Sequence, residues 1–179
     1  MGLLQIALSN TLQWEGGYVN DPQDNGETYR GISRHFWGDW QGWGIIDRYN
    51  AYKKQPAVLD KKLLKRDDLQ NLIKDFYCTN FWIPIKGDLI TSQCIANKLF
   101  DLAVNMGYKP AIKCLQKAIE VCCCNINVDG IMGDLTLNAI NTCNDVDNLL
   151  DEFKAEAEEY YKSLNKPKYL KGWLKRLYS

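Results

Sequence analysis

The chain has 179 residues, with 22 basic and 22 acidic side chains and therefore no net charge. Hydrophobic residues make up 46% and charged residues 25%, which is typical of a soluble globular protein with a real core. The balanced charge gives no overall attraction to nucleic acid, and no apolar run is long enough to span a bilayer.

The beginning of the chain predicts one helix followed by a turn-rich segment. Leucines spaced four residues apart predict a helix over residues 3–15, and Gly16-Gly17 ends it. Residues 18–32 are dense in Asn, Asp, Pro and Gly, which predicts a hairpin or an irregular lobe.

The next segment predicts only short helices. Ser33 can cap a helix that runs to Trp37, and Gly38, Gly42 and Gly44 should break it. A second short helix is expected over residues 47–54.

The remaining elements are predicted to be helices, so the fold class is mainly α with a small β-hairpin after the first helix. The first of these helices is expected over residues 67–80, and the second from Thr91 or Ser92 to a stop at Gly107. The third begins near Pro110, and the fourth starts at Asp134 or Thr136. The fifth covers residues 146–164, and a last short helix follows Pro167.

Seven cysteines and a single histidine limit the chemistry. The cysteine number is odd and their spacing fits no zinc site, so we interpret them as reduced, mostly buried side chains of a protein that folds in a reducing compartment. One histidine excludes a histidine-based triad and a multi-histidine metal site. We expect no metal and no cofactor.

Glu15 is the residue that carries the chemistry in our interpretation. It lies between an apolar segment and an acidic turn region, and cleavage of a glycosidic bond needs an acid to protonate the leaving oxygen. Asp21, Asp24 and Glu27 are candidates for the second carboxylate, and Thr28 for holding a water. The alternative is that Asp21 and Asp24 only build turns, as Asp often does.

The motif around Glu15 resembles a known enzyme family. The run Glu15-Gly16-Gly17-Tyr18-Val19-Asn20-Asp21-Pro22-x-Asp24-x-Gly26-x-Thr28-x-x-Gly31-Ile32-Ser33 is similar to the signature of glycoside hydrolase family 108. That family contains bacterial and phage N-acetylmuramidases with a lysozyme-like fold, some described as secretion activators. The resemblance implies that Glu15 is catalytic. The chain departs from the family at Glu27, where the family often has Gly.

Later segments extend the resemblance over nearly the whole chain. They include Phe100-Asp101-x-Ala103-Val104-Asn105-x-Gly107, Asp129-Gly130-x-x-Gly133-x-x-Thr136, which resembles a motif of peptidoglycan-binding modules, and Gly172-Trp173-Leu174-x-Arg176. The resemblance implies a muramidase region over residues 1–88 and a helical peptidoglycan-binding region over residues 89–179, packed as one compact unit.

Several other residues are candidates for contact with substrate. Tyr18, Asp21, Asp101 and Asn105 could bind it, although Asp101 and Asn105 could equally form a buried polar pair that braces the backbone. Three tryptophans, Trp37, Trp40 and Trp43, could form a sugar platform or pack in the core. The basic C-terminal tail either balances a helix dipole or contacts an anionic polymer.

The expected function is hydrolysis of the β-1,4 bond between N-acetylmuramic acid and N-acetylglucosamine in peptidoglycan. Glu15 is the acid, and Asp24 and Thr28 assist it. The alternative is a non-catalytic peptidoglycan-binding protein that activates secretion. We expect a monomer that binds glycan strands, with no nucleic acid partner. The N-terminus has no recognisable signal peptide, so we expect synthesis in the cytoplasm without one. The expected substrate places the action of the chain at the cell wall in the periplasm.

Overall fold

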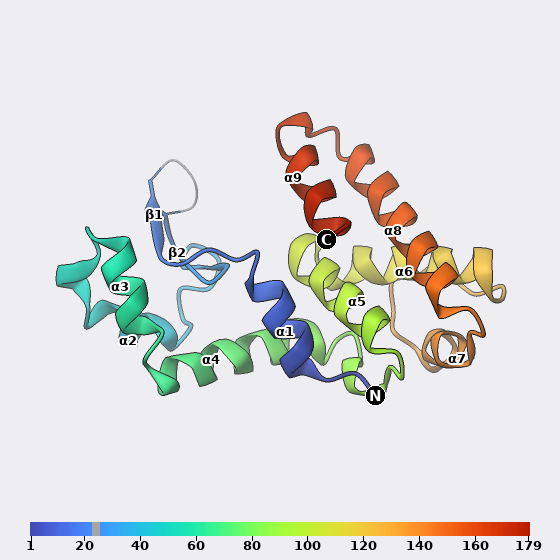
Figure 1. Ribbon diagram of the computed structural model, residues 1–179, viewed down its shortest axis with the longest axis horizontal. Helices are drawn as coiled ribbons and strands as arrows, with labels where there is room; N and C mark the ends of the chain where they lie inside the picture. The colour runs from blue at the N-terminus through green and yellow to red at the C-terminus, as the bar shows by residue number, and fades with distance from the viewer. Residues whose placement is uncertain (23–25) are drawn as a thin grey trace. The chain divides into compact units, whose positions relative to one another are not determined.

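The computed structural model describes residues 1–22 and 26–179 (Figure 1). By its contacts the chain divides into two compact units. One unit is Thr11–Cys78, and the other joins Met1–Asn10 to Thr79–Ser179. No helix in the described part of the chain is long and apolar enough to cross a membrane.

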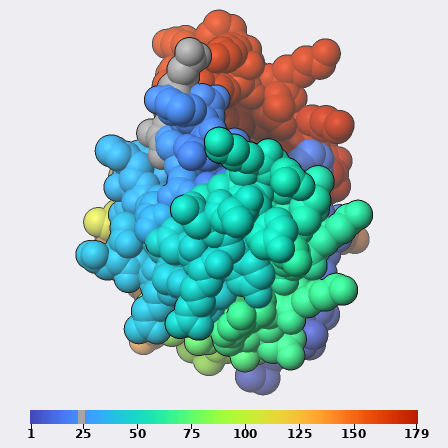
Figure 2. Space-filling model, turned by 90° about the vertical axis from the view of Figure 1, so that its left-hand side faces the viewer, coloured from blue at the N-terminus to red at the C-terminus, as the bar shows by residue number. Residues whose placement is uncertain are grey.

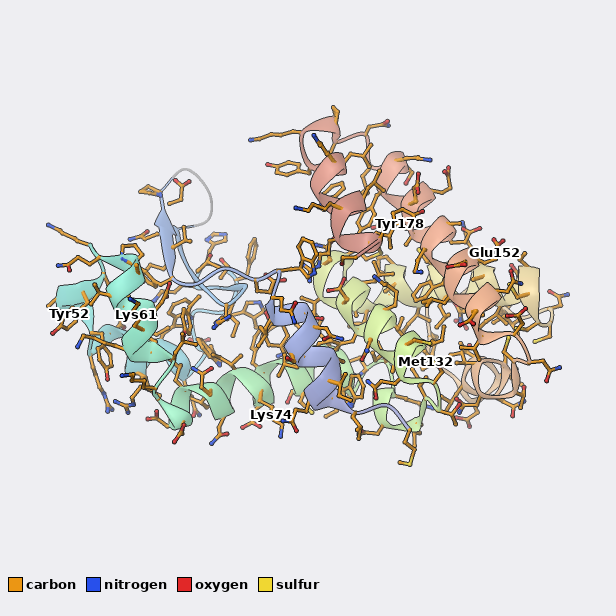
Figure 3. The ribbon with its side chains drawn as sticks, in the orientation of Figure 1. Tyr52, Lys61, Lys74, Met132, Glu152 and Tyr178 are labelled. Atoms are coloured by element: carbon orange, nitrogen blue, oxygen red, sulfur yellow. The ribbon has the colours of Figure 1, made fainter. Side chains whose placement is uncertain are left out.

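The unit Thr11–Cys78 contains a small antiparallel sheet and three helices. The strands are β1 (Val19–Asp21), β2 (Gly26–Tyr29) and β3 (Ile32–Ser33), and they pair in that order. The helices are α2 (Gly42–Asp47), α3 (Pro56–Leu63) and α4 (Asp67–Tyr77), with a 3-10 turn at Asn50–Tyr52. Figure 2 shows the surface of these helices in cyan to green. Charged side chains such as Lys61 on α3 and Lys74 on α4 extend from it (Figure 3).

Large apolar side chains fill this unit. Tyr29 and Ile32 flank the turn between β2 and β3, and both are fully buried. Trp43, Leu59 and Leu69 contribute from α2, α3 and α4, respectively. Tyr29 is the one buried residue of β2, whereas Gly26, Glu27 and Thr28 are half-buried.

Two expectations for this unit were wrong. Residues 33–37 form turns and a strand end, whereas Gly42 and Gly44, which we expected to break a helix, lie inside α2. A Cβ added at Gly42 would lie 2.2 Å from the Trp40 ring, so the glycine allows the indole to pack directly on the helix backbone. Tertiary packing thus overrides the low helix propensity of glycine here.

The other unit is helical. Its helices are α5 (Gln93–Met106), α6 (Tyr108–Cys122), α7 (Asp134–Thr142), α8 (Val146–Ser163) and α9 (Pro167–Leu177), with a π-helical turn at Cys78–Trp82 and a 3-10 turn at Gly87–Leu89. Helix α1 (Leu4–Leu12) begins in this unit and ends in the other. Helix α6 packs against both α5 and α8 (Figure 1).

The sequence predicted the starts and stops of these helices well. Ser92 caps α5 by accepting a hydrogen bond from the Ile95 amide at 3.4 Å, and Gly107 ends α5 with a φ of 90°. Asp145 caps α8 by accepting one from the Asn148 amide at 3.0 Å. The predicted fold class, mainly α with a small sheet after the first helix, is confirmed.

Candidate active site

Glu15 lies on a short connection between α1 and β1. The expected helix over residues 3–15 ends early, at Leu12, and the Trp14 amide closes a turn by donating to the Thr11 carbonyl at 3.0 Å. Glu15 follows in a bend and is half-buried. Its carboxylate is therefore placed by the loop and its contacts, and not by a helix end as the sequence suggested.

The carboxylate of Glu15 lies against the turn between β2 and β3. Tyr29 and Ile32 pair across this turn, so Arg30 and Gly31 form a two-residue hairpin loop, with φ values of 49° and 75°. A Cβ added at Gly31 would lie 2.5 Å from Glu15 Oε2. Only glycine permits both this backbone conformation and this close approach.

Tyr77 supports the same turn from α4. The same added Cβ at Gly31 would lie 2.7 Å from the Tyr77 hydroxyl, so Glu15 and Tyr77 both approach Gly31 closely. The hydroxyl donates a hydrogen bond to the Arg30 carbonyl at 2.6 Å, and the Tyr77 ring is only 1% exposed. The turn that faces Glu15 is thus fixed by a buried side chain 47 residues away.

The glycines after Glu15 have separate roles. A Cβ at Gly17 would lie 2.0 Å from Asp60 Oδ2, whereas a Cβ at Gly16 would meet nothing within 4 Å. Asp60, on α3, accepts a hydrogen bond from the Tyr18 amide at 2.7 Å. Asp60 therefore holds the loop that carries Glu15, and Gly17 leaves room for the Asp60 carboxylate.

Glu27 is the centre of a charged network on the sheet. Its carboxylate accepts hydrogen bonds from the Tyr18 hydroxyl, Arg34 Nη1 and Lys53 Nζ, each at 2.5 Å. Arg34 and Lys53 also bind Asp47: Arg34 through two bonds of 2.9 and 2.7 Å, and Lys53 at 2.9 Å. Two cations thus balance two carboxylates.

This network keeps its acids ionised. Burial alone would raise the pKa of Glu27, but the hydrogen bonds from Lys53, Tyr18 and Arg34 outweigh it and hold that pKa below its usual range. The Arg34 guanidinium likewise lowers the pKa of Asp47. Burial and the neighbouring Glu27 carboxylate raise the pKa of Tyr18. Glu27 is therefore an ionised structural carboxylate and a poor proton donor.

The other sequence candidates in this unit have different environments. Asp21 is exposed at the end of β1 and pairs with Gly26, and Thr28 is half-buried in β2 opposite Val19. Asp24, our candidate for the second catalytic group, lies outside the described residues. The Tyr18 ring is 2% exposed, which leaves little of it for direct contact with a sugar.

Exposed aromatic side chains also occur near this part of the sequence. Trp43, one of the three platform candidates, is buried, and its indole donates to the Trp37 carbonyl at 2.8 Å. Trp37 itself is 41% exposed, and Trp14, directly before Glu15, is 40% exposed. Trp14 was not among the predicted candidates, because it lies near the apolar face expected for the first helix.

Asp101 and Asn105 belong to the other unit, where both have partners. Arg176 on α9 donates to Asp101 through Nε at 3.0 Å and Nη2 at 2.9 Å, and both side chains are nearly buried. The Tyr161 hydroxyl donates to Asn105 Oδ1 at 2.6 Å. These contacts join α5 to α8 and α9, which supports the bracing interpretation over direct contact with substrate.

The Asp129-Gly130 motif of this unit is built around a buried glutamine. Gln116 is 1% exposed, and its Nε2 donates to Asp129 Oδ1 at 2.8 Å and to Thr136 Oγ1 at 3.2 Å. The Gly130 amide donates back to Gln116 Oε1 at 2.8 Å. The motif is therefore a structural brace, and among the described residues no acidic, cysteine or histidine cluster could hold a metal ion.

Comparisons with known proteins match two successive family regions of the chain. The family model described as glycosyl hydrolase 108 matches residues 8–107, and the one described as predicted peptidoglycan domain matches residues 110–178. The solved structure of Brucella abortus SagA has 26% sequence identity and a TM-score of 0.69, covering 97% of this chain and 88% of SagA. A search of curated proteins found no match. The first family model matches more than half of the residues of this chain, so the chain belongs to the glycosyl hydrolase 108 family.

Proposed function

We propose that the chain hydrolyses the β-1,4 bond between N-acetylmuramic acid and N-acetylglucosamine in peptidoglycan, with Glu15 as the general acid. Membership of a glycosyl hydrolase family supports the reaction type, and the matched peptidoglycan domain supports the polymer. The proposed site of action is the cell wall.

The observation that carries the proposal is the position of the Glu15 carboxylate. It is half-buried and lies against Gly31, on a turn held by the buried Tyr77 hydroxyl. A catalytic acid has to be positioned before substrate arrives, because misplacement by about 1 Å can cost about 10²-fold in rate. In the proposed step Glu15 gives its proton to the glycosidic oxygen as the bond from that oxygen to the muramic acid carbon breaks, and water supplies the new hydroxyl.

The second catalytic group is proposed from the residues that follow Glu15 in sequence. The ionised Glu27 carboxylate already accepts hydrogen bonds from three side chains. To bind a water or a sugar, it would have to give up one of these bonds. Asp24 and Thr28 remain the proposed partners of Glu15, as electrostatic stabiliser, nucleophile or water holder, and Asp21 is an exposed candidate for substrate contact.

The exposed indole of Trp14 extends the proposed site. It precedes Glu15 directly and is 40% exposed, and we propose that the exposed part of this indole stacks on a sugar ring next to the bond that is cut. Trp14→Ala should therefore raise KM more than it lowers kcat.

Product analysis tests the proposed specificity. Purified peptidoglycan is digested with the full chain, the new reducing ends are reduced with borohydride, and the sugars are hydrolysed and identified. A muramidase yields muramitol. Glucosaminitol as the product would instead identify a glucosaminidase, and binding to sacculi without any new reducing ends would support the non-catalytic alternative.

A further inference from the structure

A pocket of about 790 Å³ lies between α6, the loop before α7 and the end of α8. We call it the α6–α8 pocket. It lies entirely within the unit that joins Met1–Asn10 to Thr79–Ser179, and nothing in the proposed reaction uses it. Its lining includes three lysines, Lys109, Lys113 and Lys117, which recur every four residues and so lie along one face of α6.

Two of these lysines form no salt bridge within the described residues. Lys117 pairs with Glu156 at 3.1 Å, whereas Lys109 and Lys113 have no carboxylate within salt-bridge distance among those residues. Both are exposed. The hydrogen bond from Gln116 and, to a smaller extent, the charge of Lys113 lower the pKa of Asp129, so this acid partly balances Lys113.

The lysines of the lining outnumber its acids. Asp129 Oδ1 accepts hydrogen bonds from Gln116 Nε2 and from the Ile131 amide, both at 2.8 Å, but these donors are neutral, so the carboxylate keeps its charge. Glu159 pairs with Lys162 at 2.8 Å. Three lysines and two acids in the lining give the pocket a net charge of +1.

The pocket lining also contains less polar side chains. Pro110, Cys114 and Tyr160 contribute to it, and Cys114 is buried. Burial raises the pKa of the Cys114 thiol to about 11, so this side chain is neutral. The pocket thus offers both lysines and less polar side chains to a ligand.

We propose that the α6–α8 pocket binds the peptide stems of peptidoglycan, with Lys109 and Lys113 contacting stem carboxylates and the less polar part of the lining receiving alanine methyl groups. The inference rests on the proposed action on peptidoglycan. Where a stem is attached, it blocks the lactyl carboxyl group of its muramic acid as an amide. The free carboxylates of that unit then lie on the stem, so a cationic pocket adds selectivity for the stems.

A binding comparison tests this proposal. Intact sacculi, and amidated sacculi whose stem carboxylates have been converted to amides with a carbodiimide and ammonium ion, are titrated with three full-length proteins: wild type, the double variant Lys109→Gln with Lys113→Gln, and the matched control Lys171→Gln with Lys175→Gln. The control removes two exposed lysines of α9. Wild type and control should prefer intact sacculi by about 5- to 10-fold, as expected for two exposed charge pairs, and salt should weaken the preference.

The double variant should lose this preference and still release reducing ends from sacculi. A double variant that prefers intact sacculi as strongly as wild type would overturn the proposal. If the preference follows the lysines but no protein releases reducing ends, the pocket stands and the hydrolase proposal fails, so the two failures are distinguishable.

A second inference stands on a separate contact between two thiols. Cys123 ends α6 and Cys143 ends α7, and their Sγ atoms lie 2.8 Å apart. We expected mostly buried cysteines, but only Cys114 is buried, whereas Cys123 is exposed and Cys143 half-buried. Reagents in solution can therefore reach this pair.

We infer that Cys123 and Cys143 form a reversible disulfide outside the cytoplasm. In the proposed step one thiolate attacks the disulfide of a small-molecule oxidant and releases one thiol. The second cysteine then attacks the mixed disulfide and releases the other, and two protons leave the cysteines. The new bond would close a ring around the Asp129-Gly130 loop and α7, and disulfides persist at the cell wall, where the proposed substrate lies.

Cleavage of the chain at methionine tests this pairing. The full-length protein is incubated with glutathione disulfide and cut with cyanogen bromide, which separates Cys123 from Cys143 at Met132. Linked fragments should form in wild type, Cys122→Ser and Cys124→Ser, and should be absent from Cys123→Ser. The oxidised protein should melt roughly 5–10 °C higher than the reduced one. No linked fragments in wild type, or an undiminished link in Cys123→Ser, would refute the inference.

Discussion

At the scale of single residues, the candidate site depends on glycines, whose lack of a Cβ lets other side chains approach the backbone. Gly31 lets the Glu15 carboxylate approach the β2–β3 turn, and Gly17 lets the Asp60 carboxylate reach the loop. Gly16 has no such contact, although it lies in the same motif. Two of these three glycines are therefore explained by close approach, and the third offers a control.

Replacing Gly31 with alanine should displace Glu15. The new Cβ would lie 2.5 Å from Glu15 Oε2, at a φ of 75° that side chains disfavour. We expect a loss of about 1–3 kcal/mol in the free energy of unfolding and about 10²-fold in turnover. Reducing-end release and thermal melting measure the two effects.

The matched control for this prediction is Gly16→Ala. Its Cβ meets nothing within 4 Å, so turnover should stay near that of wild type. Equal losses in both variants would show that general loop stiffness, and not the contact with Glu15, determines the effect.

The residue-level site was only partly predictable. The motif identified Glu15 as the acid to test because the chemistry needs a carboxylate at a defined place in a family pattern. It could not identify Tyr77 or Asp60, which reach the site from α4 and α3 and lie 47 and 42 residues from the groups they bind. Sequence spacing has no signal for such contacts.

At the scale of elements, paired charges hold neighbouring segments together. Glu27 on β2 and Asp47 on α2 share Arg34 and Lys53, so this network ties the sheet to the helical part of its unit. In the other unit the Asp101–Arg176 pair ties α5 to α9. Arg176 of the basic tail is thus structural, and contact between the exposed lysines of the tail and an anionic polymer stays a prediction.

Acid should weaken the network on the sheet. The pKa values of Glu27 and Asp47 are lower in the folded chain than their usual values, so the unfolded chain binds more protons. The stabilisation is present above about pH 4.5 and is lost as the pH falls through the folded pKa values. Thermal melting from pH 7 to pH 3 should show a falling Tm.

Asp47→Asn provides the comparison for this pH dependence. It should cost about 1 kcal/mol at pH 7 and should reduce the drop in Tm on acidification, because one of the two titrating groups is gone. An unchanged pH dependence would mean that other carboxylates determine the acid sensitivity of the chain.

Arg176 should matter more for stability than its basic neighbours. Arg176→Gln leaves the Asp101 carboxylate in a nearly buried position without its partner, which should cost about 3–5 kcal/mol. Lys175→Gln, at an exposed position of the same helix, should change the free energy of unfolding by less than about 0.5 kcal/mol. Urea denaturation of both variants measures the difference.

Helix boundaries were predictable where local chemistry sets them. Ser92 and Gly107 act within one turn of their own helix, and both mark its ends as predicted. The predicted helix break at Gly42 was wrong because the role of this glycine depends on the Trp40 ring that packs on it. The spacing of glycines in the sequence gives no indication of such a contact. Locally determined ends can be predicted from sequence, whereas ends determined by packing cannot.

At the scale of the whole molecule, the compact units and the family regions divide the chain differently. Residues 1–10 pack with the segment after Thr79, as the Gly2 amide shows by donating to the Ile90 carbonyl at 2.6 Å. The glycosyl hydrolase match covers residues 8–107 and so includes parts of both units. The Glu15 motif lies in the unit that interrupts the other in sequence.

The most direct test of the central claim compares Glu15→Gln with wild type. Gln keeps the size of Glu15 but cannot donate the proton to the glycosidic oxygen, so turnover on purified peptidoglycan should fall by about 10²–10⁴-fold. Circular dichroism should show an unchanged fold, and Glu120→Gln, at an exposed position of α6, should keep full activity. A folded Glu15→Gln protein that releases reducing ends at the wild-type rate would contradict the account.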